Sequence, residues 1–239
     1  MAIAVPVVLS LSACAPATDT TTTGLVSTSL CGDGYALAAG VEIAQLSWQA
    51  DGPLGSNPGL PSGAWADAEM LVAVQPERLL LGPGERVAEG LLPETDIVQL
   101  DWVETVGGIN FNLAKLGGDP ISSGAETSGK RVLYLSRAGG TAGAGTFVDE
   151  AIRLAGATNI VTTPGWFTPD PEWVVAQDPD IIVTSFYGGY ESVNATGVRN
   201  RAVAEFIAAH PRIDVPGRLW PCGGPGLANA VEIIRDGLG

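Results

Sequence analysis

Basic residues are scarce in this sequence. The chain has 12 lysines and arginines against 26 aspartates and glutamates, which gives a formal net charge of −14. Such a surface repels the phosphates of nucleic acids and the headgroups of anionic lipids, and no cluster of Lys and Arg counteracts it locally. The composition therefore argues against nucleic acid as a partner.

Histidine is rarer still, because His210 is the only one in 239 residues. Sites for bare zinc or manganese need several histidines and carboxylates around the ion, which one histidine cannot supply. The sequence also lacks the Gly-x-Ser-x-Gly, His-Glu-x-x-His and Cys-x-x-Cys motifs. We therefore expect no metal site, no cofactor and no enzymatic activity. A carboxylate-based hydrolase is the alternative that the many acidic residues leave open.

No apolar run near the start is long enough to cross a bilayer, which takes about 20 residues. The short run at residues 2–11 instead fits the core of a signal peptide, and it ends in Leu-Ser-Ala-Cys14, which resembles a bacterial lipoprotein box. We expect a signal peptide at residues 1–14, lipidation of Cys14 and a flexible tether at residues 15–23. A buried N-terminal strand with an incidental cysteine is the alternative.

The most informative feature is a repeated segment. Residues 69–81 (EMLVAVQPERLLL) return as residues 172–184 (EWVVAQDPDIIVT), with the Glu, an Ala, the Pro and the acidic residue after it retained. Each copy predicts a short helix that ends at the proline and a buried parallel strand after it. A repeat at this spacing indicates two similar α/β lobes with a cleft between them.

The rest of the chain alternates in the same way, so parallel sheets covered by helices are favoured. We expect an N-terminal lobe at residues 24–118, a connection at 119–129 and a C-terminal lobe at 130–239. Outside the repeat, the apolar runs predict strands at residues 25–30, 96–100, 131–136 and 218–220, and residues 43–48 form a further apolar stretch. The predicted helices lie at residues 35–39, 146–154, 200–209 and 227–238.

Two cysteines remain if Cys14 is lipidated. Cys31 and Cys222 each follow an apolar run and adjoin glycine, so both are expected near the cleft. A disulfide between them is one hypothesis, and two free thiols, or thiols that touch ligand, are the others.

The glycine-rich segment at residues 139–146 follows a predicted strand but lacks the lysine of a phosphate-binding loop. Nucleotide binding is therefore not expected. Thr141 or Thr146 is instead expected to cap a helix or to hold an acidic ligand group.

Several motifs in order resemble the cobalamin and ferric-siderophore substrate-binding proteins of bacterial ABC importers. They are the repeats above and the segments LCGD (30–33), GTAGAGT (140–146), LAGATN (154–159) and LWPCGGP (219–225). The resemblance implies two Rossmann-like lobes around a ligand cleft and delivery of an iron chelate or cobalamin to a membrane permease and its ATPase. It implies a periplasmic or cell-envelope location, with the lipid as the only membrane contact. The usual interlobe helix is shortened here, since residues 119–129 are rich in glycine and serine.

The resemblance also suggests site residues. Glu69 and Glu172 stand where such receptors meet arginines of the permease; the alternative is that they only complement helix dipoles. Aromatic residues beside predicted loops offer flat apolar surface to a bulky ligand, although each could equally pack in the core. The expected ligand contacts are Trp48, Trp65, Trp166, Tyr187 and Tyr190, with Phe186 a further aromatic candidate and Arg137 for an anionic or carbonyl group. A haem receptor of the same fold, ligated by Tyr35, Tyr187 or Tyr190, is the alternative.

Overall fold

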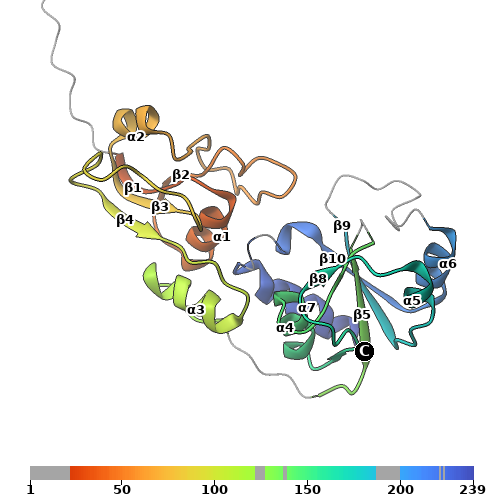
Figure 1. The fold of residues 1–239 in the computed structure, drawn as a ribbon. Helices are drawn as coiled ribbons and strands as arrows, with labels where there is room; N and C mark the ends of the chain where they lie inside the picture. The colour runs from red at the N-terminus through yellow and green to blue at the C-terminus, as the bar shows by residue number, and fades with distance from the viewer. Residues whose placement is uncertain (1–21, 122–126, 137–138, 187–199, 221, 223) are drawn as a thin grey trace, which may run out of the picture.

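The computed structural model describes residues 22–121, 127–136, 139–186, 200–220, 222 and 224–239. Cys14, Arg137, Tyr187 and Tyr190 lie outside the described residues. The described part forms two α/β lobes side by side, as Figure 1 shows. None of its helices is both long enough and apolar enough to cross a membrane.

The N-terminal lobe is built on four parallel strands in the order β2-β1-β3-β4. Its elements are β1 (Thr22–Ser27), α1 (Leu30–Ala39), β2 (Ile43–Gln45), α2 (Ala68–Val74), β3 (Pro76–Leu81), β4 (Asp96–Gln99) and α3 (Val106–Lys115). The first strand begins at Thr22, so the sheet takes up the last two residues of the predicted tether.

The C-terminal lobe repeats this plan with parallel strands in the order β10-β9-β5-β7. Its elements are β5 (Arg131–Ser136), β6 (Thr141–Ala142), α4 (Phe147–Leu154), β7 (Thr158–Asn159), β8 (Trp166–Phe167), α5 (Pro171–Val175), β9 (Ile181–Phe186), α6 (Arg201–Ala209), β10 (Arg212–Pro216), the 3-10 turn η1 (Gly217–Leu219) and α7 (Gly226–Gly237). If β5, β7, β9 and β10 are matched to β1, β2, β3 and β4, the two sheets have the same strand order. The predicted pair of similar α/β lobes is therefore confirmed.

The repeated segments take equivalent places in the two lobes. In the first copy α2 ends at Val74, Gln75 adopts a left-handed conformation with φ 44°, and Pro76 opens β3. In the second copy α5 ends at Val175 and β9 starts two residues after Pro179. Proline has no N–H to continue a helix, and its fixed φ suits the entry to a strand.

Two parts of the lobes differ from the sequence-based expectation. Residues 218–220, where a strand was predicted, instead belong to the turn η1 and its C-cap. The strand in this region is β10, in which buried Ile213 and Val215 alternate with exposed Arg212 and Asp214. Leu219 and Trp220, whose apolar side chains suggested a strand, are buried at the end of this turn. The helix α3 was not predicted, because two glycines near its start mask the apolar pattern.

The first strand also ends earlier than predicted, at Ser27, and α1 begins at Leu30. Ser29 caps this helix by accepting a hydrogen bond from the amide of Gly32 (3.1 Å). A Cβ on Gly32 would come within 2.5 Å of Ser27 Oγ, so this position suits glycine. The LCGD segment is therefore the first turn of a helix packed closely against β1.

Asp33 of this segment is a buried carboxylate that holds the loop after β2. It accepts hydrogen bonds from the backbone N–H and the hydroxyl of Ser47 (2.9 and 2.6 Å), and only 3% of the residue is exposed. Burial raises the pKa of Asp33, and the hydrogen bonds from Ser47 oppose the rise. Gln49 adds a second tie, since its side-chain oxygen accepts from the amide of Leu30 (3.2 Å).

Three kinds of contact join the lobes. Cys31 in the first turn of α1 forms a disulfide with Cys222, which follows η1. Glu150 of α4 accepts a hydrogen bond from the backbone N–H of Val106 at the start of α3 (2.8 Å). The largest hydrophobic cluster contains residues of both lobes, such as Leu113 and Ile152. In the connection, residues 116–121 and 127–130 are neither helix nor strand, and Asn110 holds the backbone of Ile121.

The disulfide predicts a large loss of stability on removal. It closes a loop with a sequence separation of 191 residues. Replacing both cysteines, in the variant Cys31→Ser/Cys222→Ser, is expected to lower the free energy of unfolding by about 2–5 kcal/mol, because the denatured chain regains freedom. Denaturant unfolding measures this, and mass spectrometry of the non-reduced protein checks the bridge. If both thiols of the native protein alkylate without reduction, the pairing is wrong.

The Asp33 network predicts a contrast between two substitutions. Asp33→Ala leaves the buried N–H and hydroxyl of Ser47 without an acceptor and is expected to cost about 1–3 kcal/mol of stability. The control Glu104→Ala, at an exposed position, is expected to stay within about 0.5 kcal/mol of the native protein.

Asp33→Asn removes the titratable carboxyl, so the difference in stability between the native protein and this variant, followed against pH, reports the titration of Asp33. Because burial raises the folded-state pKa of Asp33 above the ordinary value of 3.8, the native protein loses stability relative to Asp33→Asn as pH rises from below 3.8 through the folded pKa. Urea unfolding at a series of pH values measures the difference. If the difference in stability does not change with pH, the pKa of Asp33 is not raised in the folded protein.

Candidate ligand-binding cleft

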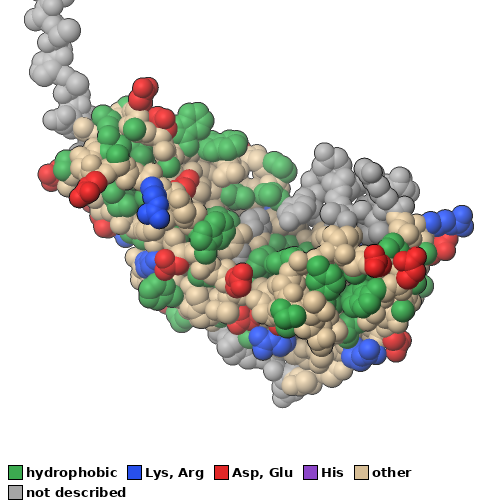
Figure 2. Space-filling view, in the orientation of Figure 1, with side chains coloured by type: hydrophobic (Ala, Val, Ile, Leu, Met, Phe, Trp, Pro, Cys, Tyr) green, Lys and Arg blue, Asp and Glu red, His purple; other side chains and the backbone are tan. Residues whose placement is uncertain are grey.

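The carboxyl ends of strands from both sheets meet between the lobes. Cys31 lies four residues beyond the end of β1, and Cys222 follows the end of β10 and η1, so their disulfide holds these two ends together, with Cα atoms 5.6 Å apart. In open α/β sheets, ligands bind outside the carboxyl ends of the strands. Figure 2 shows hydrophobic side chains around the hollow between the lobes, part of which grey atoms cover.

A pocket of about 480 Å³ lies at this junction. One wall is α1 and the other is the start of α7, and Asp119 to Ile121 of the connection close one side. The lining residues with charged or polar side chains are Asp33, Ser56, Asp119, Arg218 and Asn229. The volume falls within the range of small-molecule sites, about 300–1,000 Å³. None of the predicted ligand-contacting tryptophans lines this pocket.

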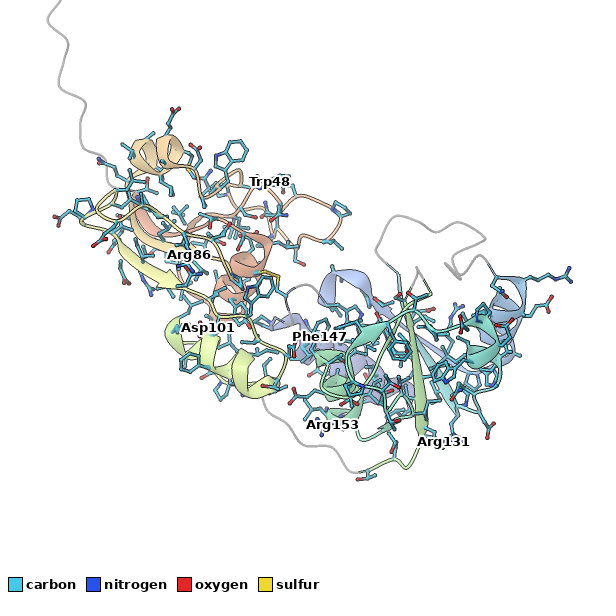
Figure 3. All side chains as sticks on the ribbon, viewed as in Figure 1. Trp48, Arg86, Asp101, Arg131, Phe147 and Arg153 are labelled. Carbon is cyan, nitrogen blue, oxygen red and sulfur yellow. A yellow bond between two sulfur atoms is a disulfide. The ribbon has the colours of Figure 1, made fainter. Side chains whose placement is uncertain are left out.

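The N-terminal lobe presents two of these tryptophans together. Trp48 and Trp65 are 57% and 51% exposed. They follow Ser47 and Ala64, which form a parallel β-bridge, and the amide of Trp48 donates to the carbonyl of Ala64 (2.9 Å). Since Asp33 anchors Ser47, the buried carboxylate fixes the base from which Trp48 projects (Figure 3).

Sequence reasoning missed a third exposed tryptophan of this lobe. Trp102 is 76% exposed and follows β4 at the carboxyl edge of the sheet. Its indole nitrogen lies beside the loop after β3, 3.7 Å from where a Cβ on Gly84 would stand. The signal was present in the sequence, because Trp102 lies just beyond the apolar strand predicted at residues 96–100.

The C-terminal lobe holds its tryptophan in an aromatic cluster. Trp166 of β8 is half exposed and packs on Phe147, with ring centroids 5.1 Å apart, and edge-on to Tyr134, at 6.1 Å. Buried Trp220 completes the cluster against Tyr134 and Phe147. Figure 3 shows Phe147 on the side of this lobe that borders the other. Trp166 therefore packs on one side and offers apolar surface on the other.

The remaining predicted contacts either lie outside the described side chains or are buried. Arg137, Tyr187 and Tyr190 lie outside the described residues, and of Phe186 only the backbone, at the end of β9, is described. Tyr35, the suggested haem ligand, is wrong as a site residue, because it is 1% exposed in the core and burial raises the pKa of its hydroxyl. It sits on the inner face of α1, which sequence periodicity over so short a helix did not reveal.

The two repeated glutamates are both exposed in first turns of equivalent helices. Glu69 lies in α2, which Asp67 caps by accepting from the amides of Glu69 and Met70 (3.0 Å each). Glu172 lies in α5, where Pro171 occupies the first turn. Neither carboxylate forms an ion pair within the described part of the chain.

Other motifs have structural roles here. Thr146 caps α4 by accepting from the amide of Asp149 (3.2 Å), and buried Thr141 donates to the carbonyl of Tyr134 (2.6 Å). His210 ends α6, with Nδ1 2.7 Å from the carbonyl oxygen of Phe206. Among the residues that the structure describes, no group of three or more His, Cys, Asp or Glu side chains is placed to hold a metal ion.

No protein-family model matches the chain, and no curated protein matches it by sequence. Solved structures do match. A periplasmic heme-binding protein of Vibrio cholerae is 20% identical with a TM-score of 0.65, over 89% of this chain and 97% of that one. A periplasmic heme-binding protein of Pseudomonas aeruginosa is 20% identical with a TM-score of 0.60, over 88% and 90%.

A periplasmic vitamin B12-binding protein of Vibrio cholerae matches as well, at 19% identity and a TM-score of 0.57, over 91% of this chain and 96% of that one. At these identities the likeness establishes the fold. The chain has the two-lobe α/β fold of these periplasmic heme-binding and vitamin B12-binding proteins.

Proposed function

We propose that this chain is the extracytoplasmic solute-binding component of a bacterial ABC importer. It captures a ligand between its lobes and delivers it, unaltered, to a membrane permease driven by an ATPase. The observation that carries the proposal is the junction itself, where the carboxyl ends of two equivalent sheets meet beside an interlobe pocket. The likeness to periplasmic binding proteins over nine-tenths of the chain supports it.

The proposed ligand is an iron chelate of the siderophore type or a cobalamin. Such ligands are bulky and bind largely through flat apolar surface, which aromatic rings supply with little loss of side-chain freedom. Trp48 and Trp65 from one lobe and Trp166 from the other are the proposed contacts, to which we add Trp102. Arg137, Tyr187 and Tyr190 retain their predicted roles as ligand contacts.

Haem is the second candidate, because several of the matching structures are described as heme-binding proteins. With Tyr35 buried, Tyr187 and Tyr190 remain as candidate ligands for the haem iron. Haem is also flat and largely apolar, so the same tryptophans suit it.

The proposed location is the periplasm or cell envelope, with the chain tethered through lipidated Cys14. A carboxylate-based hydrolase is the contrasting class. Incubation with a candidate ligand separates the two, because a receptor binds it saturably and returns it chemically unchanged.

The colour of the ligand gives a direct test. Protein purified from its native host is expected to carry the absorbance of a cobalamin, a ferric chelate or haem, and titration of the apoprotein with each identifies the class. At about 100 times the dissociation constant, the correct ligand adds about 2.7 kcal/mol of stability. A protein that no coloured compound stabilises would contradict this ligand assignment.

Substitution of the tryptophans tests the location of the site. Trp166→Ala is expected to weaken binding of the identified ligand at least tenfold, because it removes an aromatic surface worth about 1.5–3 kcal/mol. Phe111→Ala is the matched control, since Phe111 is 59% exposed on α3, beside Lys115. Equal effects of the two substitutions on ligand affinity would place the site elsewhere.

We propose that Glu69 and Glu172 meet basic residues of the permease. Their exposure, their equivalent positions and their lack of an ion pair in the described chain support this role. The variant Glu69→Arg/Glu172→Arg is expected to abolish uptake by cells while ligand affinity, measured by titration, stays within twofold of the native value. Weakened ligand binding would instead assign the two residues to the ligand site.

A further inference from the structure

The helices α2 and α5, which carry Glu69 and Glu172, each expose an apolar side chain as well as the glutamate. Val72 of α2 and Val175 of α5 are 45% and 39% exposed, and both are among the few large hydrophobic side chains that stand out on the described surface. They occupy the same place in the sequence repeat, since each comes three residues after its glutamate. An exposed valine therefore occurs at the same position of the repeat in each lobe.

Helix geometry puts each valine beside its glutamate. Residues three apart lie on one face of a helix, so Glu69 with Val72 and Glu172 with Val175 form two equivalent acid-and-valine pairs. The inner faces of the helices are occupied by other side chains, because Leu71 and Val174 are buried in the cores of their lobes. Core packing therefore does not account for the exposed valines.

The surroundings of the N-terminal pair extend its apolar part. Val72 lines a groove of about 320 Å³ whose other walls include Gln75, Leu91 and Pro93. This groove lies at the end of α2, away from the interlobe pocket, and shares no lining residue with it. It therefore offers a cavity for an apolar side chain beside Val72, with Glu94 as the acidic residue in its wall.

We infer that each acid-and-valine pair is a single two-part contact for the permease. The inference rests on the proposed function and adds the chemistry of the partner surface. That surface presents a Lys or Arg side chain beside an apolar one, and it does so twice, because two equivalent patches need two equivalent counterparts. The charge gives orientation, and burial of the valine gives affinity.

Charge complementarity favours this partner over two others. A bilayer with anionic lipids would repel these patches, since Asp67 and Asp170 add further negative charge to the glutamates at the helix starts. A second copy of this chain would bring like charges together in a symmetric contact. A basic protein surface is therefore the occupant that fits both the charge and the valine.

Crosslinking in cells identifies the partner. A photoreactive phenylalanine at position 72 or 175 is expected to crosslink to a polytopic permease subunit, identified by mass spectrometry of the crosslinked peptide. The matched control is the same residue at position 97, because Ile97 is 44% exposed but lies on β4 of the N-terminal lobe. Crosslinks chiefly to lipid or to a second copy, or equal yields from position 97, would overturn the inference.

Affinity then separates the inference from the function on which it rests. In titrations of the purified permease complex in nanodiscs, Val72→Ser and Val175→Ser are each expected to raise the dissociation constant about fivefold, and Ile97→Ser to leave it unchanged. Both valines are exposed, so unchanged thermal unfolding checks that the variants remain folded. If Glu69→Arg/Glu172→Arg abolishes binding but the serine variants bind normally, the inference fails and docking stands. If neither set weakens binding, the docking proposal itself fails.

Discussion

The junction between the lobes holds the two sheets of this protein in place. Each lobe taken alone is a small α/β unit, and the stretch between α3 and β5 is, where described, irregular chain rather than a rigid helix. The disulfide from Cys31 to Cys222, the hydrogen bond from Val106 to Glu150 and a hydrophobic cluster shared by both lobes hold the two sheets in one arrangement. A cleft needs fixed walls, and these contacts supply them.

Duplication explains much of what the junction arranges. Because the two sheets have the same strand order, their carboxyl ends, their covering helices and their repeated glutamates occur in equivalent positions. The lobes nevertheless differ in how they hold their exposed tryptophans. The N-terminal lobe carries Trp48, Trp65 and Trp102 outside its regular helices and strands, whereas the C-terminal lobe sets Trp166 into a cluster with Tyr134, Phe147 and Trp220. The duplication therefore extends to the sheets and the glutamates but not to the aromatic surface.

Asp33 connects the junction to the cleft wall. It lies two residues from the disulfide cysteine Cys31 and accepts hydrogen bonds from Ser47, in the loop that carries Trp48. The helix α1 therefore takes part in the contact between the lobes and also fixes the position of Trp48. Burying a carboxylate disfavours its charged form, as the raised pKa indicates, and the two hydrogen bonds from Ser47 offset part of that cost. A buried polar tie of this kind fixes one loop conformation, whereas apolar packing alone allows several.

The local features of this protein follow from its amino-acid sequence. The repeat, the prolines and the alternation of apolar runs were enough for two α/β lobes, and Thr146 and Asn200 stand as helix caps at the edges of predicted helices. These features depend on neighbours a few residues apart, so they can be read along the chain. Three other features depend on how the chain folds: Tyr35 lies in the core, Leu219 and Trp220 are buried at a turn, and Val72 and Val175 are exposed. An apolar side chain looks the same in sequence whether it is covered or not, because burial depends on segments that are distant in the chain and meet only when it folds.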